Sequence, residues 1–206
     1  MNCFILLPWG GDGGLAGNAE LMEYYLEKQG NYDEVGLIAP GHLEHVGAGD
    51  ILLIYGHTGA GLNEIQSNPV DESNHPSVNG TRKSMSAEAL AALMALNKLT
   101  KNIQTIILYT CFSASSTNKS ISFAERLQRA LKGKSYNKVT VYGYTKVTKD
   151  PFSKNETLKG WTITNMETME MADQGPLYNF MVGFGPGSGN KIQLITGKPV
   201  KTNEKS

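Results

Sequence analysis

Short apolar runs alternate with helical patterns along the first 145 residues, and this alternation constrains the fold most strongly. Strand-like runs occupy residues 3–7, 34–38, 50–55, 105–110 and 139–142. Patterns with one apolar helical face occupy residues 18–28, 86–99 and 122–131. Strands that alternate with helices at this rhythm predict an α/β fold, in which a mostly parallel sheet carries helices on both faces.

The rest of the chain shows less periodicity. Residues 59–85 are rich in Gly, Asn, Ser and Pro, which predicts a long loop of the kind that is usually functional or mobile. Beyond residue 145 the alternation stops, and we expect a β-rich flap over residues 146–190, followed by a last strand at 192–195. A chain of 206 residues suits one domain, here predicted over 1–197, with 198–206 as a polar, disordered tail.

Composition excludes several classes of protein. The formal net charge is zero, unlike the basic footprint of a nucleic-acid binder. No apolar run approaches the roughly 20 residues of a membrane span, and residues 1–7 lack the basic start of a secretory signal. The two cysteines, Cys3 and Cys111, form neither a disulfide framework nor a zinc-binding spacing, so no metal site is predicted. We expect a cytoplasmic protein, or one exported without a signal peptide.

A histidine and a cysteine follow two of the strand-like runs at matching places. Gly56 and His57 come after the run 51–55, and Cys111 comes after the run 106–110, with a helical pattern between them. Neighbouring parallel strands end at the same sheet edge, where such sheets place their ligands. A thiol beside an imidazole is the minimal set of groups for a cysteine nucleophile. The other histidines, His42, His45 and His75, lack this context and are expected on the surface.

The residues around the pair suit a substrate site. Glycines on either side of His57–Thr58 give close access to the backbone, and residues 112–117 are mostly small and polar. A nucleophile at a strand end can use its own backbone N–H to stabilise an oxyanion. Each residue also has a structural alternative, because a cysteine at the end of an apolar strand is commonly a small buried side chain.

Around this pair, a strand ends in Gly-His, a loop follows, a helix begins Ser-Ala-Glu, and a second strand ends in Cys before a capped helix. This order of elements resembles the caspase/gingipain-type cysteine peptidases. Within that group the chain looks most like the autoprocessing cysteine protease domain of bacterial RTX toxins, over residues 50–144. The resemblance implies a caspase-like three-layer sandwich with His57 as general base and Cys111 as nucleophile. The oxyanion would bind the backbone N–H of Cys111 and that of Thr58 or Gly59. The family commonly has Gly directly after His, where this chain has Thr58.

The toxin domains are activated by inositol hexakisphosphate, which lysines and arginines bind. The resemblance therefore implies that this polyanion could activate the present chain, with no other cofactor required. The cations that would bind it are Arg82, Lys83, Lys146, Lys149, Lys154 and Lys159. Converging cations suit phosphate, but a solvated basic face explains the same residues without a ligand.

The prediction is thus a cysteine endopeptidase that cleaves a protein or peptide through a thioester acyl-enzyme, in the manner of a bacterial effector or autoprocessing protease. Acyl transfer would use the same pair. Two alternatives stay open. The Gly-rich segment 10–17 contains a G-x-G-x-x-A match that could bind a nucleotide, although no acidic residue follows the second strand to hold a ribose. The domain could also be an inert caspase-like interaction module, because a fold does not guarantee its activity.

Overall fold

The computed structural model describes residues 1–10, 13–72, 77, 79–144, 191–195 and 198–201. Its elements in chain order are β1 (Cys3–Leu6), α1 (Gly13–Gln29), β2 (Val35–Ile38), the 3-10 helix η1 (Pro40–His45), β3 (Ile51–Tyr55), β4 (Glu64–Val70), β5 (Thr81–Ser86), α2 (Ala87–Leu96), β6 (Thr105–Tyr109), α3 (Phe123–Gly133), β7 (Thr140–Tyr144), β8 (Lys191–Ile195) and β9 (Lys198–Lys201). Within these residues no helix is both long and apolar enough to cross a membrane.

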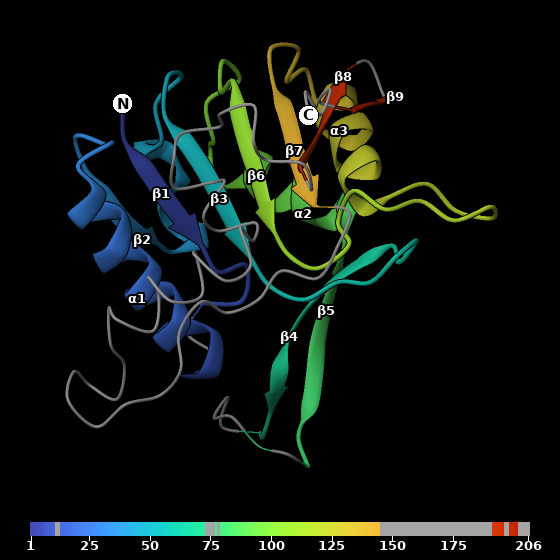
Figure 1. Ribbon diagram of the computed structural model, residues 1–206, viewed down its shortest axis with the longest axis horizontal. Coiled ribbons are helices and arrows are strands. Elements are labelled where there is room, and N and C mark those ends of the chain that lie inside the picture. The colour runs from blue at the N-terminus through green and yellow to red at the C-terminus, as the bar shows by residue number, and fades with distance from the viewer. Residues whose placement is uncertain (11–12, 73–76, 78, 145–190, 196–197, 202–206) are drawn as a thin grey trace, which may run out of the picture.

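One sheet organises the molecule (Figure 1). Its strand order is β2-β1-β3-β6-β7-β8-β9. The first five strands pair in parallel, and β8 and β9 add to the β7 edge in antiparallel orientation. The predicted α/β class with a mostly parallel sheet is therefore confirmed.

Helices cover both faces of this sheet and produce three layers. The strand β3 is buried along its whole length, and its residues alternate between two apolar cores. Leu52 and Ile54 pack with α2, α3 and η1, whereas Ile51 and Leu53 pack with α1 on the opposite face. A strand buried on both faces needs a continuous apolar sequence, which explains why the sequence predicts the central strands well.

Local capping fixes the helices that precede and follow β6. Ser86 caps α2 by accepting a hydrogen bond from the Ala89 N–H (3.1 Å), and Ser122 caps α3 in the same way from the Glu125 N–H (3.2 Å). Ala cannot supply this acceptor, and its introduction at such a position typically costs about 1 kcal/mol. Both predicted helix starts are confirmed. The α2 helix ends at Leu96, three residues before the predicted end.

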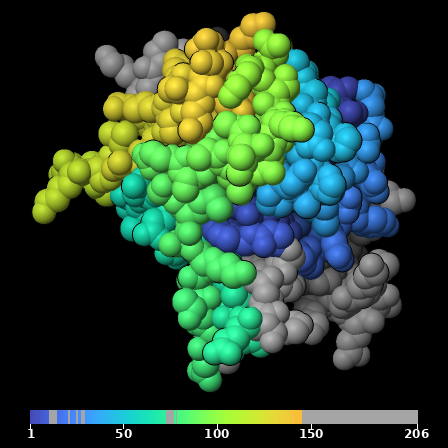
Figure 2. Space-filling model, turned by 180° about the vertical axis from the view of Figure 1, so that it is seen from behind, coloured from blue at the N-terminus to red at the C-terminus, as the bar shows by residue number. Residues whose placement is uncertain are grey.

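Two segments differ from the sequence prediction near the start and middle of the chain. The segment predicted as one long loop over 59–85 contains the antiparallel hairpin β4–β5, which extends beyond the sheet layers in Figures 1 and 2. Four successive residues of β5 are exposed, so this hairpin lacks the apolar alternation that reveals a strand. The helix α1 begins at Gly13 rather than near residue 18 and so includes part of the Gly-rich segment.

The C-terminal prediction is also only partly correct. The strand predicted at 192–195 is present as β8. Residues Lys198–Lys201, predicted as part of a disordered tail, instead form β9 and pair with β8. Lysine and proline are common on edge strands because they discourage pairing with a further strand. The same residue types made this segment look like a polar tail in the sequence. The predicted flap over 146–190 lies outside the described residues.

Candidate functional site

The strand register places His57 and Cys111 at the same level of two neighbouring strands. Tyr55 of β3 pairs with Tyr109 of β6, and His57 and Cys111 each follow two residues after their paired tyrosine. Neighbouring strands lie about 4.8 Å apart, so the two chains leave the sheet side by side. Cys111 is partly buried, so the residue keeps some exposure to solvent.

The two loops that carry this pair are bonded to each other. The Gly61 N–H, in the loop after His57, donates to the Ser115 carbonyl, in the loop after Cys111 (3.0 Å). Gly61 has a φ of +69°, and a Cβ built on it would lie 2.7 Å from the Thr117 side chain. Both features exclude a side chain at Gly61, so the contact depends on this glycine.

The hairpin β4–β5 holds His57 through backbone and side chain. His57 forms a two-way bridge with Gln66: its N–H donates to the Gln66 carbonyl (2.8 Å), and its carbonyl accepts from the Gln66 N–H (2.7 Å). The Nε2 atom of the imidazole lies 2.7 Å from Oδ1 of Asn68. Gly56 allows this approach, because a Cβ there would lie 2.7 Å from the side chain of Ile65.

The Asn68 contact decides which nitrogen of the imidazole is basic. An amide oxygen can only accept, so Nε2 of His57 carries the hydrogen and donates it. In the neutral ring, Nδ1 then carries the lone pair. Sequence reasoning missed Asn68, and the only local signal for it is a polar residue within a segment that resembles a loop. The arrangement can therefore supply a base whose second nitrogen is fixed by a third residue.

The segment after Cys111 is clamped by the buried hydroxyl of Ser113. Its Oγ donates to the Thr110 carbonyl (3.0 Å) and accepts from the Tyr144 N–H of β7 (3.0 Å). A second tie to the same strand is the bond from the Ala114 N–H to the Tyr144 carbonyl (2.9 Å). These bonds hold the Thr110–Cys111 peptide unit and tie Ser113 and Ala114, two and three residues after Cys111 in the chain, to β7.

The close approach of β7 requires glycine at one position. A Cβ built on Gly143 would lie 2.9 Å from Oγ of Ser113 and 3.1 Å from the backbone nitrogen of Ala114. Directly after Cys111, Phe112 has a φ of +50°, a left-handed conformation that is rare and costly for a bulky residue. Such strain persists only where surrounding contacts hold the backbone, and here the Ser113 contacts do so.

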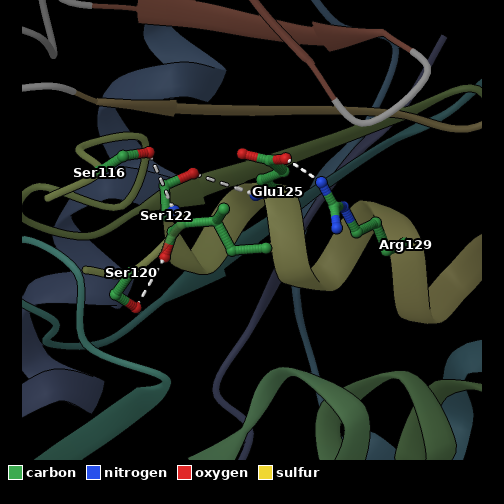
Figure 3. Close-up of polar contacts among 6 residues, drawn as sticks. Ser116, Ser120, Ser122, Glu125 and Arg129 are labelled. Carbon is green, nitrogen blue, oxygen red and sulfur yellow. Dashed lines mark hydrogen bonds and ion pairs between the residues drawn. The ribbon is translucent and has the colours of Figure 1, made fainter. Parts of the chain in front are cut away.

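A serine network connects the same loop to α3 (Figure 3). The Ser122 N–H donates to Oγ of Ser116 (3.1 Å), and Oγ of Ser122 accepts from the Glu125 N–H. The predicted capping box is therefore only half formed. The buried Glu125 carboxylate pairs instead with Arg129 one turn later (2.5 Å).

The remaining predicted site residues fall into three groups. Thr58 and Gly59 lie in the loop after His57, where the Thr58 hydroxyl donates to the Glu64 carbonyl (2.9 Å). Arg82 and Lys83 lie on β5 rather than in a loop before the helix, and Nη1 of Arg82 donates to the Ser67 carbonyl (2.9 Å). The other predicted polyanion ligands, Lys146, Lys149, Lys154 and Lys159, lie outside the described residues. The structure thus brings together the loops of His57 and Cys111.

The two cysteines have different environments. Burial, together with the nearby negative charge of Asp50, raises the pKa of the Cys3 thiol to about 12. Cys3 is fully buried in the core beside α1, whereas Cys111 is partly exposed at the sheet edge. A buried neutral thiol is inert toward electrophiles, so Cys3 serves as an internal reference for the reactivity of Cys111.

A scan of the chain against models of known protein families finds no match, and a search of curated proteins finds no relative.

Proposed function

We propose that this protein is a cysteine peptidase with Cys111 as nucleophile, His57 as general base and acid, and Asn68 as the residue that orients the imidazole. The observation that carries the proposal is the direct bond between the His57 and Cys111 loops, from Gly61 to Ser115, at the ends of two register-paired strands. The contact between Gly61 and Ser115 requires glycine and holds the two loops together, which would not be needed if His57 and Cys111 had unrelated roles.

The residues support a two-step reaction. Nδ1 of His57 accepts the thiol proton, and the Cys111 sulfur attacks the carbonyl carbon of a peptide bond, which moves an electron pair onto the carbonyl oxygen. That oxyanion would bind the backbone N–H groups of Cys111 and of Thr58 or Gly59. Collapse breaks the C–N bond, and His57 returns the proton to the leaving amine. Water, deprotonated by His57, then hydrolyses the thioester and restores the thiol.

The caspase-like identity forms part of this proposal. A mostly parallel sheet between helices, with His and Cys after adjacent strands, supports it. Activation by inositol hexakisphosphate is a further part, and it draws on Arg82 and Lys83, two exposed cations that lie next to each other on β5. Successive strand side chains point to opposite faces, so these two residues alone cannot converge on one phosphate group.

Thiol reactivity tests the pair before any substrate is known. The rate of Cys111 alkylation by iodoacetamide is measured at neutral pH by peptide mass spectrometry in wild type, His57→Ala and Asn68→Ala, with and without inositol hexakisphosphate. We expect Cys111 to react faster than a free cysteine in wild type and to lose this advantage in His57→Ala, while Cys3 stays unmodified. A peptide library then tests cleavage, with Cys111→Ala as the inactive control.

The opposite result is equally informative. If Cys111 reacts no faster than a free thiol, and His57→Ala changes nothing with or without the polyanion, the peptidase proposal is refuted. The chain would then be an inert module of the same fold.

A further inference from the structure

Three potential metal ligands meet on the 3-10 helix η1, on the segment between β2 and β3. His42, Glu44 and His45 each place a ligand atom within 4.8 Å of the others. Nδ1 of His42 lies 4.0 Å and Nε2 of His45 lies 3.7 Å from Oε1 of Glu44. We propose that these three residues bind a divalent transition metal ion of the zinc class, at a surface site separate from His57 and Cys111.

The backbone beneath these ligands is already fixed. Leu43, between the two histidines, is fully buried, and Val46 directly after them is 1% exposed. The His42 N–H donates to the Ala39 carbonyl (3.0 Å), and the Val46 N–H donates to the Leu43 carbonyl (3.2 Å). An ion therefore has to order only three side chains and no loop, which lowers the entropic cost of binding.

The three ligand atoms lie within 4.8 Å of one another and have to move closer together to hold an ion. Ligand bonds of about 2.0–2.2 Å in a tetrahedral zinc site place neighbouring ligand atoms roughly 3.3 Å apart. The two histidine–glutamate separations, 3.7 and 4.0 Å, exceed this by less than 1 Å. All three side chains are exposed, at 42–69%, so rotation about their side-chain bonds can close the gap without moving packed groups. In the view of Figure 2, the light-blue segment that includes η1 lies on the surface.

The donor set also selects the class of ion. Two imidazole nitrogens and one carboxylate oxygen suit Zn²⁺, Ni²⁺ or Cu²⁺, whereas Mg²⁺ and Ca²⁺ prefer sites made of oxygen alone. Three protein ligands leave a coordination position for water. The sequence predicts no metal site, because the two histidines lack a strand-end context and the cysteines lack a zinc spacing. The sequence alone does not reveal that Leu43 is buried, and this burial leaves His42 and His45 on the exposed side of η1.

Calorimetric titration of Zn²⁺ into the tag-free full chain tests this site. Cys111→Ala serves as the background, because a thiol beside an imidazole could bind zinc by itself. We expect saturable binding, which His42→Ala and His45→Ala each weaken. Loss of an outer-shell partner typically costs about 10- to 100-fold in metal affinity, so loss of a ligand should cost at least as much. His57→Ala is the matched control and should leave the affinity unchanged.

Two results would overturn the assignment. One is an unchanged zinc affinity in the double variant His42→Ala/His45→Ala. The other is binding of Mg²⁺ as tight as that of Zn²⁺, since this would indicate an oxygen site elsewhere. The substituted side chains are exposed, so the variants should fold, and their circular dichroism checks this. Failure of the peptidase proposal would not affect either result.

Discussion

Ser113→Ala tests whether the clamp beside Cys111 contributes to both stability and reactivity. The substitution removes one buried oxygen, which accepts from the Tyr144 N–H and donates to the Thr110 carbonyl at 3.0 Å each. A buried donor left without a partner costs about 1–3 kcal/mol, and the second lost bond adds about 1 kcal/mol. We therefore expect a loss of about 2–4 kcal/mol in the free energy of unfolding. For a chain of this size, that lowers the Tm by about 5–15 °C.

The assay measures urea unfolding and Cys111 alkylation on the same variants at a temperature where all are folded. Ser84→Ala on exposed β5 is the matched control and should change stability by less than about 0.5 kcal/mol. Because the Ser113 hydroxyl holds the Thr110 carbonyl of the peptide unit before Cys111, its loss should also slow alkylation of this thiol. A Ser113→Ala stability within 0.5 kcal/mol of wild type would refute the energetic argument. An unchanged alkylation rate in a destabilised variant would refute the positioning argument.

Three further predictions concern groups around the same core and site. Burial raises the pKa of Cys3 to about 12, so above pH 8.5 the unfolded chain releases a proton that the folded chain keeps. The free energy of unfolding should thus be flat below about pH 8.5 and fall by up to about 1.4 kcal/mol per pH unit above it. Urea unfolding between pH 8 and 10 should show this slope in wild type and not in Cys3→Ala. Asn68→Ala should slow Cys111 alkylation and any peptide cleavage. Asn68→Asp should keep part of the wild-type rate, because a carboxylate also accepts a hydrogen bond from Nε2 of His57. Equal rates in wild type, Asn68→Ala and Asn68→Asp would exclude an orienting role for Asn68. Gly61→Ala should destabilise the fold by about 1–3 kcal/mol in thermal unfolding, because the residue has a positive φ and its Cβ would lie 2.7 Å from the Thr117 side chain. The control Gly49→Ala should not destabilise the fold, because the space around a Cβ at that position is open.

The parts of the fold that could be predicted are those in which local sequence and burial agree. The strands β3 and β6 are apolar because both faces are covered, and the N-cap serines act on amides three residues away. The half-formed capping box shows the limit of local reasoning. The spacing of Ser122 and Glu125 is correct, but Arg129 one turn later takes the carboxylate.

The hairpin that completes the candidate site could not be predicted for a physical reason. Between Gln66 and Pro69 the β4–β5 register shifts, so the alternation that marks a strand is broken where Asn68 lies. Bulges of this kind commonly re-aim a side chain near functional sites. The contact between Asn68 and His57 depends on the chain folding back over the end of β3, and no short-range pattern encodes that return.

The proposed catalytic role of His57 requires a ring tautomer that leaves a basic nitrogen for the thiol of Cys111. An imidazole free to rotate would present either nitrogen to the thiol and would spend part of its time with an N–H there, unable to accept a proton. The bond from Nε2 to Asn68, supported by the bridge to Gln66, leaves Nδ1 as the basic atom. The strained left-handed backbone of Phe112 lies next to Cys111 in the chain, and the Ser113 contacts hold the adjoining residues. Backbone strain beside Cys111 and an imidazole held by Asn68 occur at the same sheet edge, and both features support the proposed catalytic pair.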